Sequence, residues 1–194
     1  MKLTALTLRD AQQARHWRNE HREALRTPFL ITDKQQEEFY NSLTRNSNMR
    51  YWGIEISGGF GGMGGLTGIE WENRIAEISL IIDPLLRRKG YGAKAVELIL
   101  HEGFGNMGLA TIYGECYECN PALPFWQKLC IKYRGYTTIL PRRKFWAGRY
   151  YDSLYFSLSC SFSIGGDVCG FDNAQEQGHG ADYGAKRGSC GCGA

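Results

Sequence analysis

The sequence lacks the features that mark membrane-spanning, secreted or nucleotide-hydrolysing proteins. Among its 194 residues no apolar run approaches the ~20 residues that span a bilayer. The apolar start at Met1–Leu6 is too short for a signal peptide, because charged residues follow at Arg9 and Asp10. No G-x-x-x-x-G-K-[ST] phosphate loop occurs. We therefore expect a cytoplasmic protein with no membrane partner.

Strong charge and metal-binding spacing are missing as well. The formal net charge is only +3, which is too weak to indicate a nucleic-acid partner. Cys116 and Cys119 form a C-x-x-C pair, but no second cysteine pair follows at zinc-finger spacing. On a strand, residues three apart face opposite sides of the sheet. We therefore predict no metal site and no role for nucleic acid.

Glycine, in contrast, is abundant, with 25 residues gathered mainly in two segments. Residues 58–65 lie between two apolar segments, and we predict a flexible connection between strands there. The segment from residue 165 onward combines many glycines with few aliphatic residues, so it cannot bury enough surface to order itself. We therefore expect one domain over residues 1–159 and a flexible glycine-rich, cysteine-containing tail over 160–194.

The hydrophobic period within residues 1–159 alternates between that of helices and that of strands. Predicted helices cover 9–26, 33–46, 92–107 and 123–131, and the first is long enough for two short helices broken near Asn19. Predicted strands cover 3–6, 51–56, 66–71, 75–82, 111–117, 136–140 and 151–158. Residues 78–82 are apolar at nearly every position, as in a central strand. The order βααβββαβαββ predicts an α+β fold on a mixed, mainly antiparallel sheet flanked by helices.

The segment R-R-K-G-Y-G-A joins this central strand to the next helix. The first N–H groups of a helix and its dipole favour an anion there. Gly90 and Gly92 allow the backbone to approach a phosphate, while neighbouring basic side chains add positive charge. The predicted contacts are Arg87, Arg88, Lys89, Gly90, Tyr91, Gly92 and Ala93. The alternative is a solvated basic loop.

Several segments together resemble the GNAT family of N-acetyltransferases. Its acetyl-CoA motif, R/Q-x-x-G-x-G/A, is matched by Arg87, Gly90 and Gly92. Asn120 and the helix F-W-Q-K-L resemble the family's asparagine and following helix. The closing G-R-Y-Y-D-S-L-Y resembles the branch that contains ribosomal-protein N-terminal and amino-sugar acetyltransferases. The resemblance covers residues 1 to about 159.

This resemblance implies direct acetyl transfer from acetyl-CoA to a primary amine, with no metal. It also implies that the backbone of 78–82 binds the pantetheine arm, with Ile81 and Ile82 as contacts, and that Asn120 and Trp126 lie on the cofactor side. Trp126 stands where the family has a tyrosine general acid, and an indole cannot fill that role. Tyr117, Tyr133 or solvent remain as alternatives.

The reaction also needs a group that takes a proton from the acceptor amine, because only an uncharged nitrogen can attack. Glu77 precedes the central strand where some family members place their catalytic glutamate. Glu70, on the neighbouring strand, is the substitute candidate.

The acceptor itself is predicted from charge. Arg18, Arg22 and Arg26 are spaced along the first helical segment, and a basic cluster lies at 142–144. A basic border favours an amine on an anionic carrier, either a protein N-terminus or an amino-sugar nucleotide. The alternatives are a polyamine or aminoglycoside acetyltransferase, and a non-catalytic acyl-CoA-binding or nucleic-acid-associated module on the same fold. A homodimer is left open.

Overall fold

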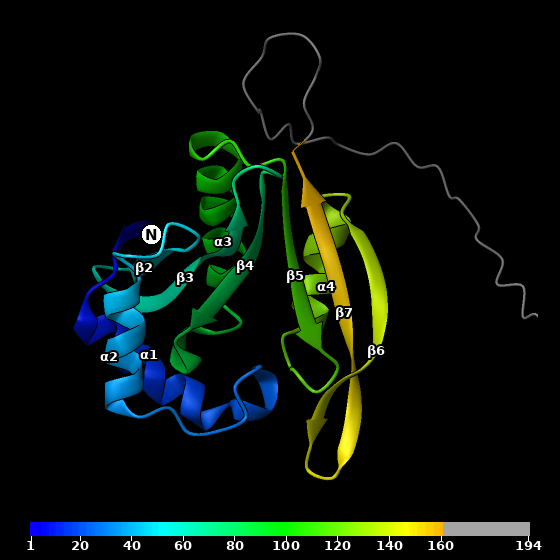
Figure 1. Ribbon diagram of the computed structural model, residues 1–194, viewed down its shortest axis with the longest axis horizontal. Helices are drawn as coiled ribbons and strands as arrows, with labels where there is room; N and C mark the ends of the chain where they lie inside the picture. The colour runs from blue at the N-terminus through cyan, green and yellow to red at the C-terminus, as the bar shows by residue number, and fades with distance from the viewer. Residues whose placement is uncertain (161–194) are drawn as a thin grey trace, which may run out of the picture.

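The computed structural model describes residues 1–160, which form one seven-stranded sheet in the order β1-β2-β3-β4-β5-β7-β6 (Figure 1). The strands are β1 (Lys2–Ala5), β2 (Arg50–Ile56), β3 (Gly59–Glu70), β4 (Ile75–Ile82), β5 (Thr111–Tyr117), β6 (Tyr136–Trp146) and β7 (Arg149–Ser159). All neighbouring strands are antiparallel except β4 and β5. The predicted fold class is therefore confirmed. The predicted tail lies, beyond Cys160, outside the described residues.

Four α-helices and three short helical turns complete the described chain. They are α1 (Leu8–Glu20), η1 (Arg22–Ala24), α2 (Asp33–Ser42), η2 (Pro84–Leu86), α3 (Tyr91–His101), η3 (Glu102–Asn106) and α4 (Leu123–Lys132). Capping boxes begin two of the helices: Thr7 and Asp10 begin α1, and Thr32 and Gln35 begin α2, which starts at the predicted residue 33. The helical segment predicted over 9–26 is divided at His21 into α1 and the short η1, close to the break that the sequence allowed near Asn19.

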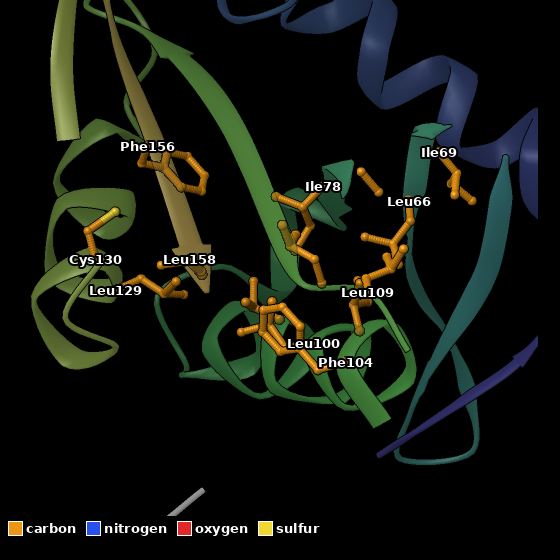
Figure 2. Close-up of a cluster of buried hydrophobic side chains, with 14 residues drawn as sticks. Leu66, Ile69, Ile78, Leu100, Phe104, Leu109, Leu129, Cys130, Phe156 and Leu158 are labelled. Carbon is orange, nitrogen blue, oxygen red and sulfur yellow. The ribbon is translucent and has the colours of Figure 1, made fainter. Parts of the chain in front are cut away.

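Helices cover both faces of the sheet. On one face α1 packs on β3, where Trp17 stacks on Phe60 with ring centroids 5.6 Å apart. On the other face α3 and α4 enclose the main core, which includes Ile78 from β4 and Phe156 from β7 (Figure 2). Successive residues of β4 therefore point to opposite faces of the sheet, since Ile81 packs toward α1 and Ile82 toward α3.

The flexible connection predicted at 58–65 is wrong, because these glycines form the first half of β3. Small residues are needed there, since a Cβ at Gly62 would lie 2.5 Å from the carbonyl oxygen of Ile81 and one at Gly64 would lie 2.6 Å from Ile99. The glycines let β4 and α3 approach the strand closely, so tertiary packing overrides the low strand propensity of glycine.

The Gly62→Ala variant is expected to be less stable by about 1–3 kcal/mol, because its Cβ must displace the β4 backbone. The matched control is Gly59→Ala, where the nearest atom to a Cβ is the Ile56 carbonyl oxygen, 4.0 Å away. Its change should stay within about 0.5 kcal/mol. Urea unfolding of both variants tests this, and equal midpoints would contradict the packing role of Gly62.

Candidate active site

The two parallel strands at the centre of the sheet pair over only three residues. Their register runs from Ile75 with Thr111 to Glu77 with Tyr113, and no pair is formed beyond it in the described chain. The two strands then diverge toward their carboxyl ends (Figure 1). Residues 78–82 keep their bonds to β3 on one edge, while the edge that faces β5 has no strand partner. Backbone N–H and C=O groups there can bind an extended ligand.

A pocket of about 410 Å³ lies at the start of this divergence. Its lining comes from the segment after η1 and from β4, β5, β6 and β7. The lining residues are Arg26, Glu77, Tyr113, Glu115, Tyr117, Leu140, Arg143 and Tyr155. The pocket thus joins carboxylates, guanidinium groups and phenol rings. These are groups that can bind a charged amine and move protons.

Glu77 is the last β4 residue that pairs with β5, and its side chain is only 17% exposed. Both of its carboxylate oxygens accept hydrogen bonds from Arg26, Oε2 from Nη1 at 2.9 Å and Oε1 from Nη2. The structure therefore places the predicted base inside the pocket. Glu70 does not line the pocket; it accepts a 2.7 Å hydrogen bond from Asn73 in the turn after β3.

Glu115 is a second carboxylate in the pocket, and its side chain is 5% exposed. It accepts hydrogen bonds from Ser153 at 2.6 Å, from Arg143 at 2.9 Å and from Arg26 at 3.1 Å. Burial alone would raise its pKa, but these donors and positive charges outweigh burial, so the pKa of Glu115 lies below its usual value. The carboxylate is therefore held ionised.

Three tyrosines form the aromatic part of the lining. The rings of Tyr113 and Tyr155 stack with centroids 5.6 Å apart, and Tyr117 is 8% exposed at the end of β5. Burial raises the pKa of all three phenols, and the nearby glutamates raise it further. The phenols therefore remain protonated at neutral pH and can donate a proton. Tyr133, the other candidate acid, ends α4 and does not line the pocket.

The segment that places Arg26 in the pocket is fixed by hydrogen bonds to its backbone carbonyl oxygens. The ammonium of Lys144, a β6 residue that is 7% exposed, donates to the carbonyl oxygens of Arg22, at 2.9 Å, and Leu25. Asn120 Nδ2 donates to the Ala24 carbonyl oxygen at 3.1 Å, and Cys119 Sγ donates to that of Glu23 at the same distance. Strand β6 and the segment after β5, both distant from η1 in sequence, thus hold η1 beside the sheet.

The predicted phosphate loop leads directly into α3. Gly90 occupies its N-cap with φ of 82°, a left-handed conformation suited to glycine, and no side chain caps the helix. Arg88 and Lys89 are exposed beside these first N–H groups, whereas Tyr91 packs partly into the core. Arg87 turns away and donates to the Ile82 carbonyl oxygen at 3.3 Å. The loop therefore fits an anion through the backbone and two of its three basic side chains.

Two predicted cofactor contacts, Trp126 and Asn120, make contacts within the protein. Trp126 stacks on Phe156 with centroids 4.9 Å apart, so its ring fills the space between α4 and the sheet. The side chain of Asn120 is engaged with η1 and with the Ala122 N–H at 2.8 Å. Neither residue lines the pocket. Of the remaining predicted contacts, Ala93 is exposed in the first turn of α3, next to Gly92.

The basic border predicted for an anionic acceptor is largely engaged within the protein. Arg26 and Arg143 pair with Glu115, and Lys144 is buried against backbone carbonyl groups. Arg22 lies over the Trp146 ring at 5.6 Å. Arg18 is half-buried, and this burial lowers its pKa. Glu115 was not predicted from the sequence. It lies on the same face of the sheet as Glu77, and only the register between β4 and β5 reveals this position.

The model of the GNAT acetyltransferase domain matches residues 1–123, more than half of the chain. The chain belongs to the GNAT acetyltransferase family. The family prediction is thereby confirmed, and membership makes the protein an acyltransferase. No curated protein sequence matches the chain.

Solved structures with the same fold include spermidine N-acetyltransferases from Vibrio cholerae. The complex of that enzyme with CoA and spermine is 22% identical, has a TM-score of 0.72 and covers 81% of this chain and 94% of its own. A dodecameric structure is also 22% identical, with a TM-score of 0.68 and coverages of 81% and 92%. At this identity the likeness shows the fold alone. It gives no specific support to the predicted ribosomal-protein or amino-sugar branch.

Membrane and metal features are absent from the part of the chain that the structure describes. No helix in residues 1–160 is long and apolar enough to cross a bilayer. The same residues contain no group of three or more histidine, cysteine or acidic side chains arranged to hold a metal ion.

The Gly92→Asp variant is expected to lose measurable acetyl-CoA binding, because it places a carboxylate at the first turn of α3, where the phosphates would lie. A Cβ at Gly92 meets only the Phe125 ring, at 3.6 Å, and an acidic residue suits a helix N-terminus, so the fold should persist. Gly92→Ala is the matched control and should retain affinity. Calorimetry measures both, and retained affinity in the Asp variant would contradict the loop assignment.

The Glu115→Gln variant is expected to lose about 1–3 kcal/mol of stability at pH 7, because charged hydrogen bonds to Glu115 are removed. The folded-state pKa of Glu115 is lowered, so wild type gains stability above the ordinary pKa near 4.3 and loses it as the pH falls through the folded value. The variant should therefore show a smaller loss between pH 7 and pH 3 in urea unfolding. Exposed Glu118→Gln should behave like wild type.

Proposed function

We propose that residues 1–159 form an acetyl-CoA-dependent N-acetyltransferase whose acceptor is a small cationic amine of the polyamine class. The observation that carries the proposal is the pair of carboxylates, Glu77 and Glu115, beside stacked tyrosines where β4 and β5 diverge. An ammonium group is attracted both by carboxylates and by the faces of aromatic rings. The similar structure solved with CoA and spermine supports this acceptor class.

Acetyl-CoA fits the open edge of β4 and the start of α3. The backbone groups of residues 78–82 that have no strand partner on the side of β5 would hold the pantetheine arm, and the N–H groups after Gly90 would bind the pyrophosphate. Arg88 and Lys89 add positive charge there. Ile82 would contact the arm from the α3 side and Ile81 from the acceptor side. The acetyl group then lies next to the pocket that contains Glu77.

Transfer proceeds directly between the two substrates. Glu77 accepts a proton from the acceptor ammonium, and the freed nitrogen attacks the thioester carbonyl carbon. The C–N bond forms as the C–S bond breaks, and a β4 backbone N–H stabilises the negative charge on the carbonyl oxygen. Tyr117 donates its phenol proton to the leaving sulfur, and the resulting phenolate is reprotonated by the second proton that the newly acetylated nitrogen must lose, while Glu77 releases its proton to solvent. The raised pKa of Tyr117 keeps the phenol proton in place at neutral pH.

A second candidate acceptor is an amine on an anionic carrier, as the sequence predicted. It is favoured by the tip of the β6–β7 hairpin, which projects beyond β5 (Figure 1). Arg142 lies 4.6 Å above the Tyr150 ring and Arg149 lies 4.2 Å above Tyr151. Phe145 is 59% exposed beside them. Such a basic, aromatic surface can bind a nucleotide or an acidic peptide.

The test is an assay of CoA thiol release with spermidine, an aminoglycoside, an N-terminal peptide and an amino-sugar nucleotide as acceptors. We expect saturable turnover with spermidine. Glu77→Gln should lower that turnover by roughly 10²–10⁴-fold without changing acetyl-CoA affinity, while Glu70→Gln stays near wild type. Turnover of only the peptide or sugar nucleotide would favour the second candidate. No thiol release with any amine would contradict an acetyltransferase.

A further inference from the structure

The proposed acceptor pocket already contains a cation, the guanidinium of Arg26. Its Nη2 donates to both carboxylates, Glu77 and Glu115, and its Nη1 donates to Glu77. One nitrogen atom thus lies between two acidic groups whose side chains are 17% and 5% exposed. This is the arrangement that a substrate ammonium group would require.

Hydrogen bonds fix the backbone next to Arg26, whereas the Arg26 side chain is free to leave the pocket. The backbone before it is fixed by bonds from Asn120 and Lys144 to η1 and Leu25. The Arg26 side chain is nevertheless 54% exposed, so its guanidinium can rotate into solvent without unfolding the segment. The protein can therefore present the guanidinium to the pocket and withdraw it.

Glu77 cannot serve an acceptor amine while Arg26 is in place. Both of its oxygens accept hydrogen bonds from the guanidinium, in the two-point geometry that arginine forms with carboxylates. An incoming ammonium must replace at least one of these bonds before Glu77 can take its proton. Binding of the substrate and release of Arg26 are thus coupled events.

We propose that Arg26 occupies the ammonium subsite of the acceptor pocket and that a cationic substrate displaces it. Arg26 then competes with the substrate for the pocket, since only a ligand that replaces the contacts of Arg26 with both Glu77 and Glu115 binds with high affinity. A compound with one weakly held ammonium group is excluded, whereas a di- or triamine is accepted. This inference rests on the proposed acceptor class, but its test measures binding rather than turnover.

The test is calorimetric titration of the full-length protein with spermidine. Arg26→Gln should bind spermidine about tenfold more tightly than wild type, a gain equivalent to about 1.4 kcal/mol. Arg9→Gln is the control with the same change in net charge, because Arg9 is exposed at the start of α1 and does not line the pocket. Its affinity should change by less than about twofold. The double variant Arg26→Gln with Glu77→Gln should lose the gain.

Each result separates this inference from the proposed function. Weaker or unchanged binding in Arg26→Gln, equal gains in Arg26→Gln and Arg9→Gln, or no spermidine binding in any variant would overturn the inference. Loss of affinity in Arg26→Gln would show that Arg26 contacts the substrate. Tighter binding by Arg26→Gln without acetylation of spermidine would support the subsite and contradict spermidine as the acceptor. Melting curves establish that each variant is folded.

Discussion

The parallel pairing of β4 and β5 ends at Glu77 and Tyr113, and the candidate site depends on this early separation. If the strands remained paired to their carboxyl ends, residues 78–82 would have no free edge. The pocket lined by Glu115 and Tyr117 would then be closed as well. The separation is possible because each strand is paired along its other edge, β4 with β3 and β5 with β7. The sheet therefore remains continuous around an opening that holds backbone donors.

The acceptor side of this opening is built by contacts between segments far apart in the chain. Lys144 from β6 and Asn120 from the loop after β5 both bond to backbone carbonyl groups around η1. Burial lowers the pKa of Lys144, because it disfavours the charged ammonium, and the nearby Cys119 and Glu23 offset this lowering in part. A family-typical asparagine thus supports the acceptor wall here.

Local patterns predicted the elements and their order, because the helical and strand periods are clear over most of residues 1–159. They failed at Gly59–Gly65, where the reason for a strand lies in the atoms of β4 and α3 rather than in the glycines themselves. Glu77 was found by its place before the central strand. Glu115 was missed because a carboxylate on a predicted strand shows its role only when Arg26, 89 residues away, is placed beside it. Trp126, which the family resemblance places on the cofactor side, stacks on Phe156.

The glycine-rich half of β3 also bears on the order in which the protein folds. Glycine loses more conformational freedom than any other residue on folding, and it has no side chain with which to start a strand. β3 lies between β2 and β4 in the sheet, so both neighbours depend on it for their hydrogen bonds. We therefore expect Gly59–Gly65 to order late in folding, because its bare backbone needs the surface of β4 and α3 to pack against.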